Sequence, residues 1–377
     1  MKQLLHISIF FLLNLLDAQS QAPPAAPGHV QLAPGREAVF RYPTIARLND
    51  DRLLCVYSKE EKNNFEQYRI VVEGIFSDDH GISWSKPVIL IDADPSLSLD
   101  ASIVVTSKAV IVNSTVVPKT HYKFVSTSKT MAVRSEDNGK TWSEVYEIPI
   151  NHRYVAGKIN PGVTLDNGVS FFPYAWDKGL QTKAKISGDN EQNCISGLML
   201  SIDGGLSWKQ GPQFMIRKKK TAKNAINGLD EPAIVKCPDG SLYMLFRTGF
   251  DRLYESRSRN GGKTWSAPGP SALKSHDAPA ALCEVTGDSP AILAVWNNSE
   301  NSRWPLAAAM SFDNGKSWTS PKVIAEYPGY QSSYPGCVQA ADGTIVIVWQ
   351  QNHADRPRTI EMKRITAAWL VNDRAAE

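Results

Sequence analysis

Five short segments of this 377-residue chain place an acidic or amide side chain at the same position of one pattern. The pattern is Ser-x-Asp/Asn-x-Gly-x-Ser/Thr-Trp, and its copies begin at Ser77, Ser135, Ser201, Ser258 and Ser311. Recurrent carboxylates could act as catalytic acids, but Asp or Asn followed two residues later by Gly is typical of a tight turn. The side chain accepts hydrogen bonds from the backbone ahead of it, and Gly adopts positive φ without a steric penalty. We therefore interpret these residues as turn formers and not as catalytic groups.

The histidines and cysteines do not have the spacing of a metal site. None of the seven His residues forms an H-x-x-x-H pair, and none of the five Cys residues forms C-x-x-C, so we expect no metal and no other cofactor. No phosphate-binding glycine loop precedes an expected helix, which argues against a nucleotide site. The chain has 41 Lys and Arg residues against 38 Asp and Glu residues. This balance excludes the strongly basic surface typical of nucleic-acid-binding proteins.

The elements that position any site must follow the repeat. The five turns begin 58, 66, 57 and 53 residues apart, and a period of this size indicates a repeat protein. Apolar runs such as residues 242–246 precede the turns, and two more, 344–349 and 360–369, follow the last turn. The chain has room for roughly six such units, and four-stranded blades around an axis suit them because radial repetition leaves only short edges. The sequence therefore predicts an all-β fold, a six-bladed β-propeller.

The N-terminus has the features of a secretory signal peptide. An apolar run at residues 7–16 follows Lys2 and precedes a small-x-small sequence that ends at Ser20. The run is too short to span a bilayer, which needs about 20 apolar residues. We expect a signal peptide at 1–20, an N-terminal segment at 21–35 and the propeller at 36–377. The protein is then predicted to be secreted (extracellular, periplasmic or in the secretory or lysosomal pathway), without a membrane span.

The five cysteines would meet oxidising conditions in a secreted chain. Their spacing shows no disulfide framework, and an odd number leaves at least one cysteine unpaired within a monomer. Cys55 and Cys237 lie in apolar runs, where we expect buried free thiols.

The five turns resemble the Asp-boxes of the sialidase (neuraminidase) superfamily, and the resemblance covers nearly the whole chain after residue 20. Because non-catalytic propellers also carry Asp-boxes, the catalytic residues need matches of their own. Phe40-Arg41-Tyr-Pro resembles the family segment that supplies the first of three arginines. The segment 229–247 resembles the one with the activating glutamate and the second arginine, and Arg303 lies before the fifth turn, where the third is found. Ser333-Tyr334 resembles the segment of the nucleophilic tyrosine.

The resemblance implies an exo-glycosidase that hydrolyses terminal sialic acid, or a related acidic sugar, from glycans with retained configuration. Arg41, Arg247 and Arg303 would bind the substrate carboxylate, because guanidinium groups form bidentate bonds with carboxylates. Tyr334 would attack the anomeric carbon. Its pKa of about 10 makes it a poor nucleophile alone, so Glu231 would act as its base. Sialylated or other acidic glycans are the expected partners.

The acid/base aspartate of the family has no counterpart at its expected place, because residues 58–69 contain no Asp. Glu66 is closest to the expected spacing, and Glu60 and Glu61 are alternatives, since a glutamate can perform the same proton transfer. Asp277, with His276 beside it, is a further candidate for contact with the substrate. Two other functions stay open: a non-catalytic propeller that binds acidic glycans, and a glycosidase that acts on a different sugar.

Overall fold

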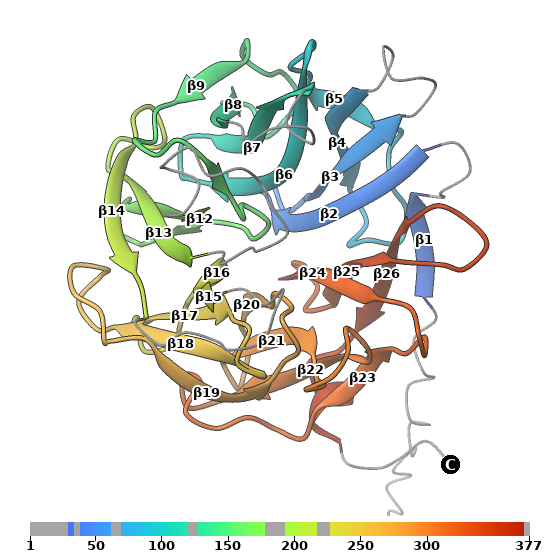
Figure 1. The fold of residues 1–377 in the computed structure, drawn as a ribbon. Coiled ribbons are helices and arrows are strands. Elements are labelled where there is room, and N and C mark those ends of the chain that lie inside the picture. Colours follow the sequence, from blue (N-terminus) through green and yellow to red (C-terminus); the bar gives the residue numbers. More distant parts are fainter. Residues whose placement is uncertain are drawn as a thin grey trace, which may run out of the picture.

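The computed structural model describes residues 29–33, 38–61, 69–119, 127–177, 193–216 and 227–372. The predicted signal peptide, most of the N-terminal segment and Glu66 lie outside these residues. The described chain forms 26 strands and one short helix, α1 (Ala367–Val371). The strands make six sheets arranged as blades around a central axis (Figure 1). The predicted all-β six-bladed propeller is confirmed.

The blades follow one another along the chain, and in each blade the first strand lies nearest the axis. Blade 1 contains β2 (Ala38–Arg47), β3 (Leu53–Glu61), β4 (Arg69–Ser77) and β5 (Val88–Ile91). Blade 2 contains β6 (Ser96–Val105), β7 (Val110–Pro118), β8 (Lys129–Ser135) and β9 (Tyr146–Ile148). Blade 3 contains β10 (Val155–Ala156) and β11 (Val163–Thr164), then β12 (Ser170–Asp177), β13 (Asn193–Ser201) and β14 (Lys209–Phe214), with β15 (Asn227–Gly228) beside β13.

The other three blades repeat this arrangement. Blade 4 contains β16 (Asp230–Lys236), β17 (Leu242–Arg247), β18 (Arg252–Ser258) and β19 (Gly269–Lys274). Blade 5 contains β20 (Ala281–Val285), β21 (Ala291–Asn297), β22 (Leu306–Ser311) and β23 (Lys322–Ala325). Blade 6 contains β24 (Ser332–Gln339), β25 (Ile345–Gln351) and β26 (Thr359–Ile365), and its outer strand is β1 (His29–Ala33).

Blade 6 closes the ring because its strands come from both ends of the described chain. β1 pairs antiparallel with β26, with Val30 opposite Met362. In blades 1 to 5 the Asp-box connects the third strand to the fourth. In blade 6 these two strands are not consecutive in the chain, so no turn can join them. This explains why six blades carry five Asp-boxes.

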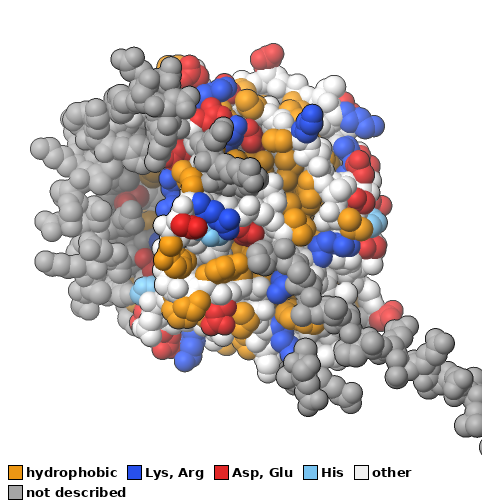
Figure 2. Space-filling view, turned by 90° about the vertical axis from the view of Figure 1, so that its right-hand side faces the viewer, with side chains coloured by type: hydrophobic (Ala, Val, Ile, Leu, Met, Phe, Trp, Pro, Cys, Tyr) orange, Lys and Arg blue, Asp and Glu red, His pale blue; other side chains and the backbone are white. Residues whose placement is uncertain are grey.

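The apolar core lies between neighbouring blades. Six main clusters of buried residues each combine side chains from two adjacent blades. Strands in the middle of a blade are covered on both faces, and all seven residues of β21 are buried. Covered strands of this kind appear in the sequence as continuous apolar runs instead of alternating ones. On the face in Figure 2, charged side chains of both signs are interspersed among the described residues, in keeping with the net charge of +3.

The Asp-box turns are built as the sequence predicts. In the first, Ser77 Oγ donates to Asp79 Oδ1 at 2.8 Å and accepts from Gly81 N at 2.8 Å. Ser83 donates to Asp79 through both its N (2.8 Å) and its Oγ (2.6 Å). These hydrogen bonds, chiefly those from Ser83, lower the pKa of Asp79 to about 2. The carboxylate is thus an ionised acceptor within its own turn, and corresponding bonds form in the other four copies.

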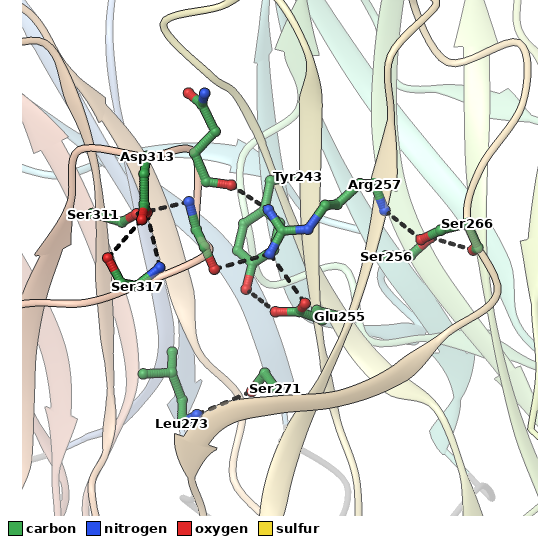
Figure 3. A network of polar contacts seen from close by, with 12 residues as sticks. Tyr243, Glu255, Ser256, Arg257, Ser266, Ser271, Leu273, Ser311, Asp313 and Ser317 are labelled. Carbon is green, nitrogen blue, oxygen red and sulfur yellow. Dashed lines mark hydrogen bonds and ion pairs between the residues drawn. The ribbon is translucent and has the colours of Figure 1, made fainter.

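Arginines of neighbouring blades bind the backbone of these turns. Arg257 on β18 of blade 4 donates to the carbonyls of Asn314 and Gly315 in the Asp-box of blade 5, and also to Glu255 (Figure 3). The guanidinium lies 4.5 Å from the centroid of the Tyr243 ring, whose hydroxyl donates to Glu255 at 2.7 Å. This turn therefore stabilises an interface between two blades as well as one hairpin.

Candidate active site

Three residues of the inner strands share an unusual backbone conformation. Tyr42 on β2, Glu231 on β16 and Tyr334 on β24 have φ values of 53°, 39° and 54°. Each is followed by proline and lies where the register with the second strand shifts, which marks a β-bulge. Left-handed backbone is costly for residues with a side chain and is concentrated at functional sites. Burial, and then the charges of Tyr334 and Glu231, raise the pKa of Tyr42, and the rings of Tyr42 and Tyr334 are in contact.

Arg247, the last residue of β17, is held between two carboxylates. Its Nη1 lies 2.6 Å from Glu231 Oε2, and its Nε donates to Asp277 Oδ1 at 3.0 Å. The Arg247 and Glu231 side chains are 11% and 12% exposed, so the ion pair is largely shielded from water. Asp230 lies opposite Arg247 in the sheet register. Burial, and then the charge of Glu231, raise the pKa of Asp230 to about 7.

Arg303 reaches Tyr334 from the loop before β22. Its Nη2 donates to the backbone carbonyl of Asp277 at 2.5 Å, and its Nη1 lies 3.5 Å from the Tyr334 hydroxyl. Burial, followed by the charge of Glu231, raises the pKa of Tyr334, whereas Arg247 and Arg303 lower it. Because the net shift is upward, Tyr334 is a neutral phenol at neutral pH, placed beside two cations and a carboxylate.

Arg41 precedes Tyr42 and is paired with Glu60 of the neighbouring strand. Its Nε donates to Glu60 Oε2 at 2.8 Å, and its Nη2 lies 2.5 Å from the same oxygen. Glu60 is only 1% exposed, so it is a buried partner of Arg41. The charge of Arg41 lowers the pKa of Tyr42, and the ring of Tyr42 packs edge-on against Tyr334 with the centroids 4.7 Å apart. Arg41 thereby adjoins the same cluster.

The predicted site residues thus divide into three groups. Direct contacts join Arg247, Arg303, Glu231, Asp277 and Tyr334, and Arg41 adjoins them through Tyr42. Glu66, the predicted acid, lies outside the described residues. The alternatives Glu60 and Glu61 have partners, since Glu61 Oε1 lies 2.8 Å from Lys59 Nζ.

A fourth arginine, Arg358, belongs to this cluster and was not predicted from the sequence. It lies just before β26, and its carbonyl accepts a hydrogen bond from Phe40 N at 3.3 Å, which joins it to β2. Burial, and then the charge of Arg41, lower the pKa of Arg358, while Tyr334 is among the groups that raise it. No motif marks Arg358. Its place between the last two apolar runs, in the same blade as Tyr334, is the signal that could have pointed to it.

Asp100 was not predicted either. It occupies the bulge of β6 in blade 2, is 5% exposed and raises the pKa of Tyr42. Its Oδ2 accepts a hydrogen bond from the backbone N of Lys158 at 2.9 Å. Lys158 is fully buried, its Nζ donates to Thr115 Oγ1, and burial lowers its pKa to about 8. The bulge of blade 2 has no proline after it, so the sequence gives little sign of this position.

A cavity of about 450 Å³ adjoins Asp277 and Arg303. His276 and Trp304 line one part of it, and residues 329–331 line another. A cation and an aromatic ring at the wall of a cavity suit a sugar that carries a negative charge.

In the part of the chain that the structure describes, no group of three or more His, Cys, Asp and Glu side chains could hold a metal ion. Within the same residues, no helix is long and apolar enough to cross a membrane.

Comparisons with known proteins agree with this fold. Residues 112–347, more than half of the chain, match the family model of the BNR repeat-like domain, and residues 75–86 match the BNR/Asp-box repeat. A sialidase of Clostridium perfringens is 24% identical over 250 residues, which are 60% of this chain and 60% of that protein. A sialidase of Paraclostridium sordellii is 22% identical over 254 residues, 61% of this chain and 58% of that protein. The matched region thus spans about three fifths of these relatives.

Two solved structures show the likeness of fold. The K499G mutant of NanB sialidase from Streptococcus pneumoniae superposes with a TM-score of 0.72 at 15% identity, covering 93% of this chain and 72% of that one. The intramolecular trans-sialidase from Ruminococcus gnavus, in complex with oseltamivir carboxylate, gives a TM-score of 0.68 at 14% identity. That match covers 89% of this chain and 96% of the other. At such identities the superpositions establish the shared propeller.

Proposed function

Because the chain belongs to the BNR repeat-like domain family, we propose that it is a retaining exo-glycosidase that removes terminal sialic acid, or a related acidic sugar, from glycans. One observation carries the proposal. The Tyr334 hydroxyl lies beside Arg303, and Glu231, whose charge raises the pKa of Tyr334, is paired with Arg247. A phenol, a carboxylate and two guanidinium groups are thereby gathered at one end of the propeller axis. The sialidase activity of the curated relatives supports the same class of substrate.

The arginines favour a substrate with a carboxylate. Arg247 and Arg303 are oriented by Asp277, through its side chain and its backbone carbonyl respectively, and Arg41 is oriented by Glu60. Guanidinium groups fixed in this way can form bidentate bonds with a carboxylate at low entropic cost. A carboxylate nucleophile would be repelled by the charge of such a substrate, which favours a neutral phenol.

In the proposed reaction, Tyr334 Oη forms a bond with the anomeric carbon as the bond from that carbon to the leaving oxygen breaks. Glu231 accepts the phenolic proton, directly or through water, because the pKa of Tyr334 is raised and the phenol is not ionised beforehand. An acid must protonate the leaving oxygen, and we assign that role to Glu66. Water, which gives a proton to the now ionised Glu66, then attacks the anomeric carbon as the bond to Tyr334 Oη breaks and Glu231 returns the proton to the phenol. Two inversions give retention.

The proposed location follows from the predicted signal peptide. A chain that is secreted meets glycans in an extracellular, periplasmic or lysosomal compartment, where acidic sugars at chain ends are accessible. Secretion is measured by expressing the full chain in a homologous secretory system and determining the N-terminus of the exported protein, with cleavage expected after residue 20. An exported chain that keeps residues 1–20 would contradict the assignment.

The activity is tested with a fluorogenic sialoside and, for comparison, with neutral glycosides. Wild-type protein is expected to release the fluorophore from the sialoside, and Tyr334→Phe is expected to lower kcat by at least about a thousandfold because the nucleophilic oxygen is lost. Tyr330→Phe, which alters an exposed tyrosine at the rim of the nearby cavity, is the matched control. Binding of the sialoside without turnover would favour the non-catalytic propeller, and turnover of a neutral glycoside would favour a different sugar.

A further inference from the structure

Two buried cysteines lie together at the end of the axis away from the candidate active site. Cys283 is on β20 and Cys337 is on β24, the innermost strands of blades 5 and 6, and they are 8% and 2% exposed. Both belong to the apolar cluster between these blades, and both line one cavity of about 260 Å³. The cavity also includes the final residues of other inner strands, such as Arg47 and Lys236. The residues of the active-site cluster on these strands, such as Tyr42, Glu231 and Tyr334, lie in the first halves of the strands.

The two thiols lie on the inner strands of adjacent blades, β20 and β24, within one apolar cluster. Burial and the Cys283 thiol beside it raise the pKa of Cys337 well above its ordinary value. The other cysteines occupy separate places: Cys55 lies between blades 6 and 1, Cys237 lies between blades 4 and 5, and Cys194 is on β13 of blade 3. Among the five cysteines, all of which are described and buried, Cys283 and Cys337 are the two that share an apolar cluster.

We propose that Cys283 and Cys337 are joined by a disulfide bond between blades 5 and 6 when the protein folds in an oxidising compartment. A low-molecular-weight disulfide serves as the oxidant. One cysteine thiolate attacks it and releases one small thiol, and the second cysteine thiolate then attacks the mixed disulfide and releases another. The two cysteines lose two protons and two electrons, and these appear in the two small thiols.

The environment of the pair determines when the bond forms. Because burial disfavours the thiolate, exchange in the folded protein is slow, so we infer that the bond forms before blades 5 and 6 close. Once formed, it joins the strand that carries Tyr334, three residues before Cys337, to the strand that follows Asp277. The bond thus links two inner strands whose opposite ends adjoin the proposed active site. The inference does not depend on the proposed glycosidase activity.

The bond is tested by refolding the full chain with oxidised and reduced glutathione and then alkylating it in denaturant. The expected product carries three alkyl groups on its five cysteines, and peptide mapping joins Cys283 to Cys337. Protein refolded in excess reductant carries five. Alkylation of all five cysteines after refolding with the oxidant, or a bond mapped to another pair, would overturn the proposal.

Variants separate the bond from general effects of mutation. Cys283→Ser and Cys337→Ala are each expected to carry four alkyl groups, whereas Cys237→Ser is expected to keep the bond and to carry two. In wild type and in Cys237→Ser, oxidation should raise Tm by about 5 °C, as is typical for a disulfide in a large domain. The two pair variants should show no such rise. The alkylation experiment and the glycosidase assay measure different properties, so a negative outcome of one does not decide the other.

Discussion

At the scale of single residues, the site balances its cations before any substrate is bound. Arg247 is compensated by Glu231 and Asp277, and Arg41 is compensated by Glu60. Such pairs hold the guanidinium groups in one orientation, because a guanidinium that turned away would leave a shielded carboxylate without its partner charge. A substrate carboxylate therefore meets arginines that are already positioned and need little reorganisation.

Glu60 allows a test of this positioning role against catalysis. Glu60→Gln is expected to raise KM for the sialoside about tenfold and to change kcat much less, since Arg41 loses its ionic partner but the reacting groups remain. Steady-state kinetics with substrates of good and poor leaving groups provide the measurement. Glu73→Gln, another buried glutamate of blade 1, is the control. A fall in kcat confined to poor leaving groups would instead identify Glu60 as the acid.

Asp230 predicts a dependence of stability on pH. Its pKa is about 7 in the folded protein against an ordinary value of 3.8, so the folded state binds more protons than the unfolded state between these values. Stability from this group is then complete below about pH 4 and is lost as the pH rises to about 7. Asp230→Asn removes this loss, and we expect it to stabilise the protein by on the order of 2 kcal/mol more at pH 8 than at pH 4.

Urea denaturation of wild type and Asp230→Asn at several pH values measures the difference. The difference in the free energy of unfolding should increase between pH 4 and 7 and then level off. Asp251→Asn, a change at an exposed residue between β17 and β18 of the same blade, provides the control. A difference that does not vary with pH would contradict the raised pKa.

At the scale of elements, the bulges of the inner strands orient the site, and the Asp-boxes join the blades. The clearest case is Arg257, which donates to two carbonyls of the next blade's Asp-box. Arg52 of blade 1 and Arg364 of blade 6 bind the turns at Asn138 and His80 in the same way. The carbonyl is in each case that of a residue with positive φ, so the turn conformation directs it outward.

Arg257→Ala should therefore weaken an interface and not only a surface contact. We expect a loss of about 2 kcal/mol in the free energy of unfolding, because buried carbonyls lose charged donors and the Tyr243 ring loses its cation. Equilibrium denaturation measures this, and Arg259→Ala, which truncates an exposed arginine at the end of the same strand, is the matched control. Equal effects of the two substitutions would show that the contacts in Figure 3 contribute little.

Sequence could predict the elements better than the site. The Asp-boxes specify their turns through local hydrogen bonds, so five copies indicated blades, and their spacing together with the chain length indicated six. The residues of the site come from different blades, and a local pattern cannot show that the carbonyl of Arg358 binds Phe40, the residue before Arg41. Asp100 was missed for the same reason, because it reaches the cluster from blade 2 through a bulge without a proline. Glu231 and Tyr334 were named from a family resemblance, and their roles stay predictions.

At the scale of the whole molecule, closure of the ring depends on β1. Deleting residues 29–33 removes the outer strand of blade 6 and exposes the edge of β26. We expect Tm to fall by about 10 °C or more and the protein to aggregate, since an open edge can pair with another chain. A chain that starts at residue 29 is the control and should behave as wild type does. Light scattering and thermal unfolding measure both effects, and an unchanged Tm would show that β1 is dispensable.

The absence of an Asp-box between β26 and β1 suggests a circular permutation of the propeller. The junction between β26 and β1 is open where the other five blades have an Asp-box, and α1 follows β26 there. Joining these strands through an eight-residue turn copied from Ser77–Trp84, and opening the backbone at another blade's turn, would give a circular permutant with the same propeller. A permutant that keeps its Tm would show that the propeller does not require its opening to lie in blade 6.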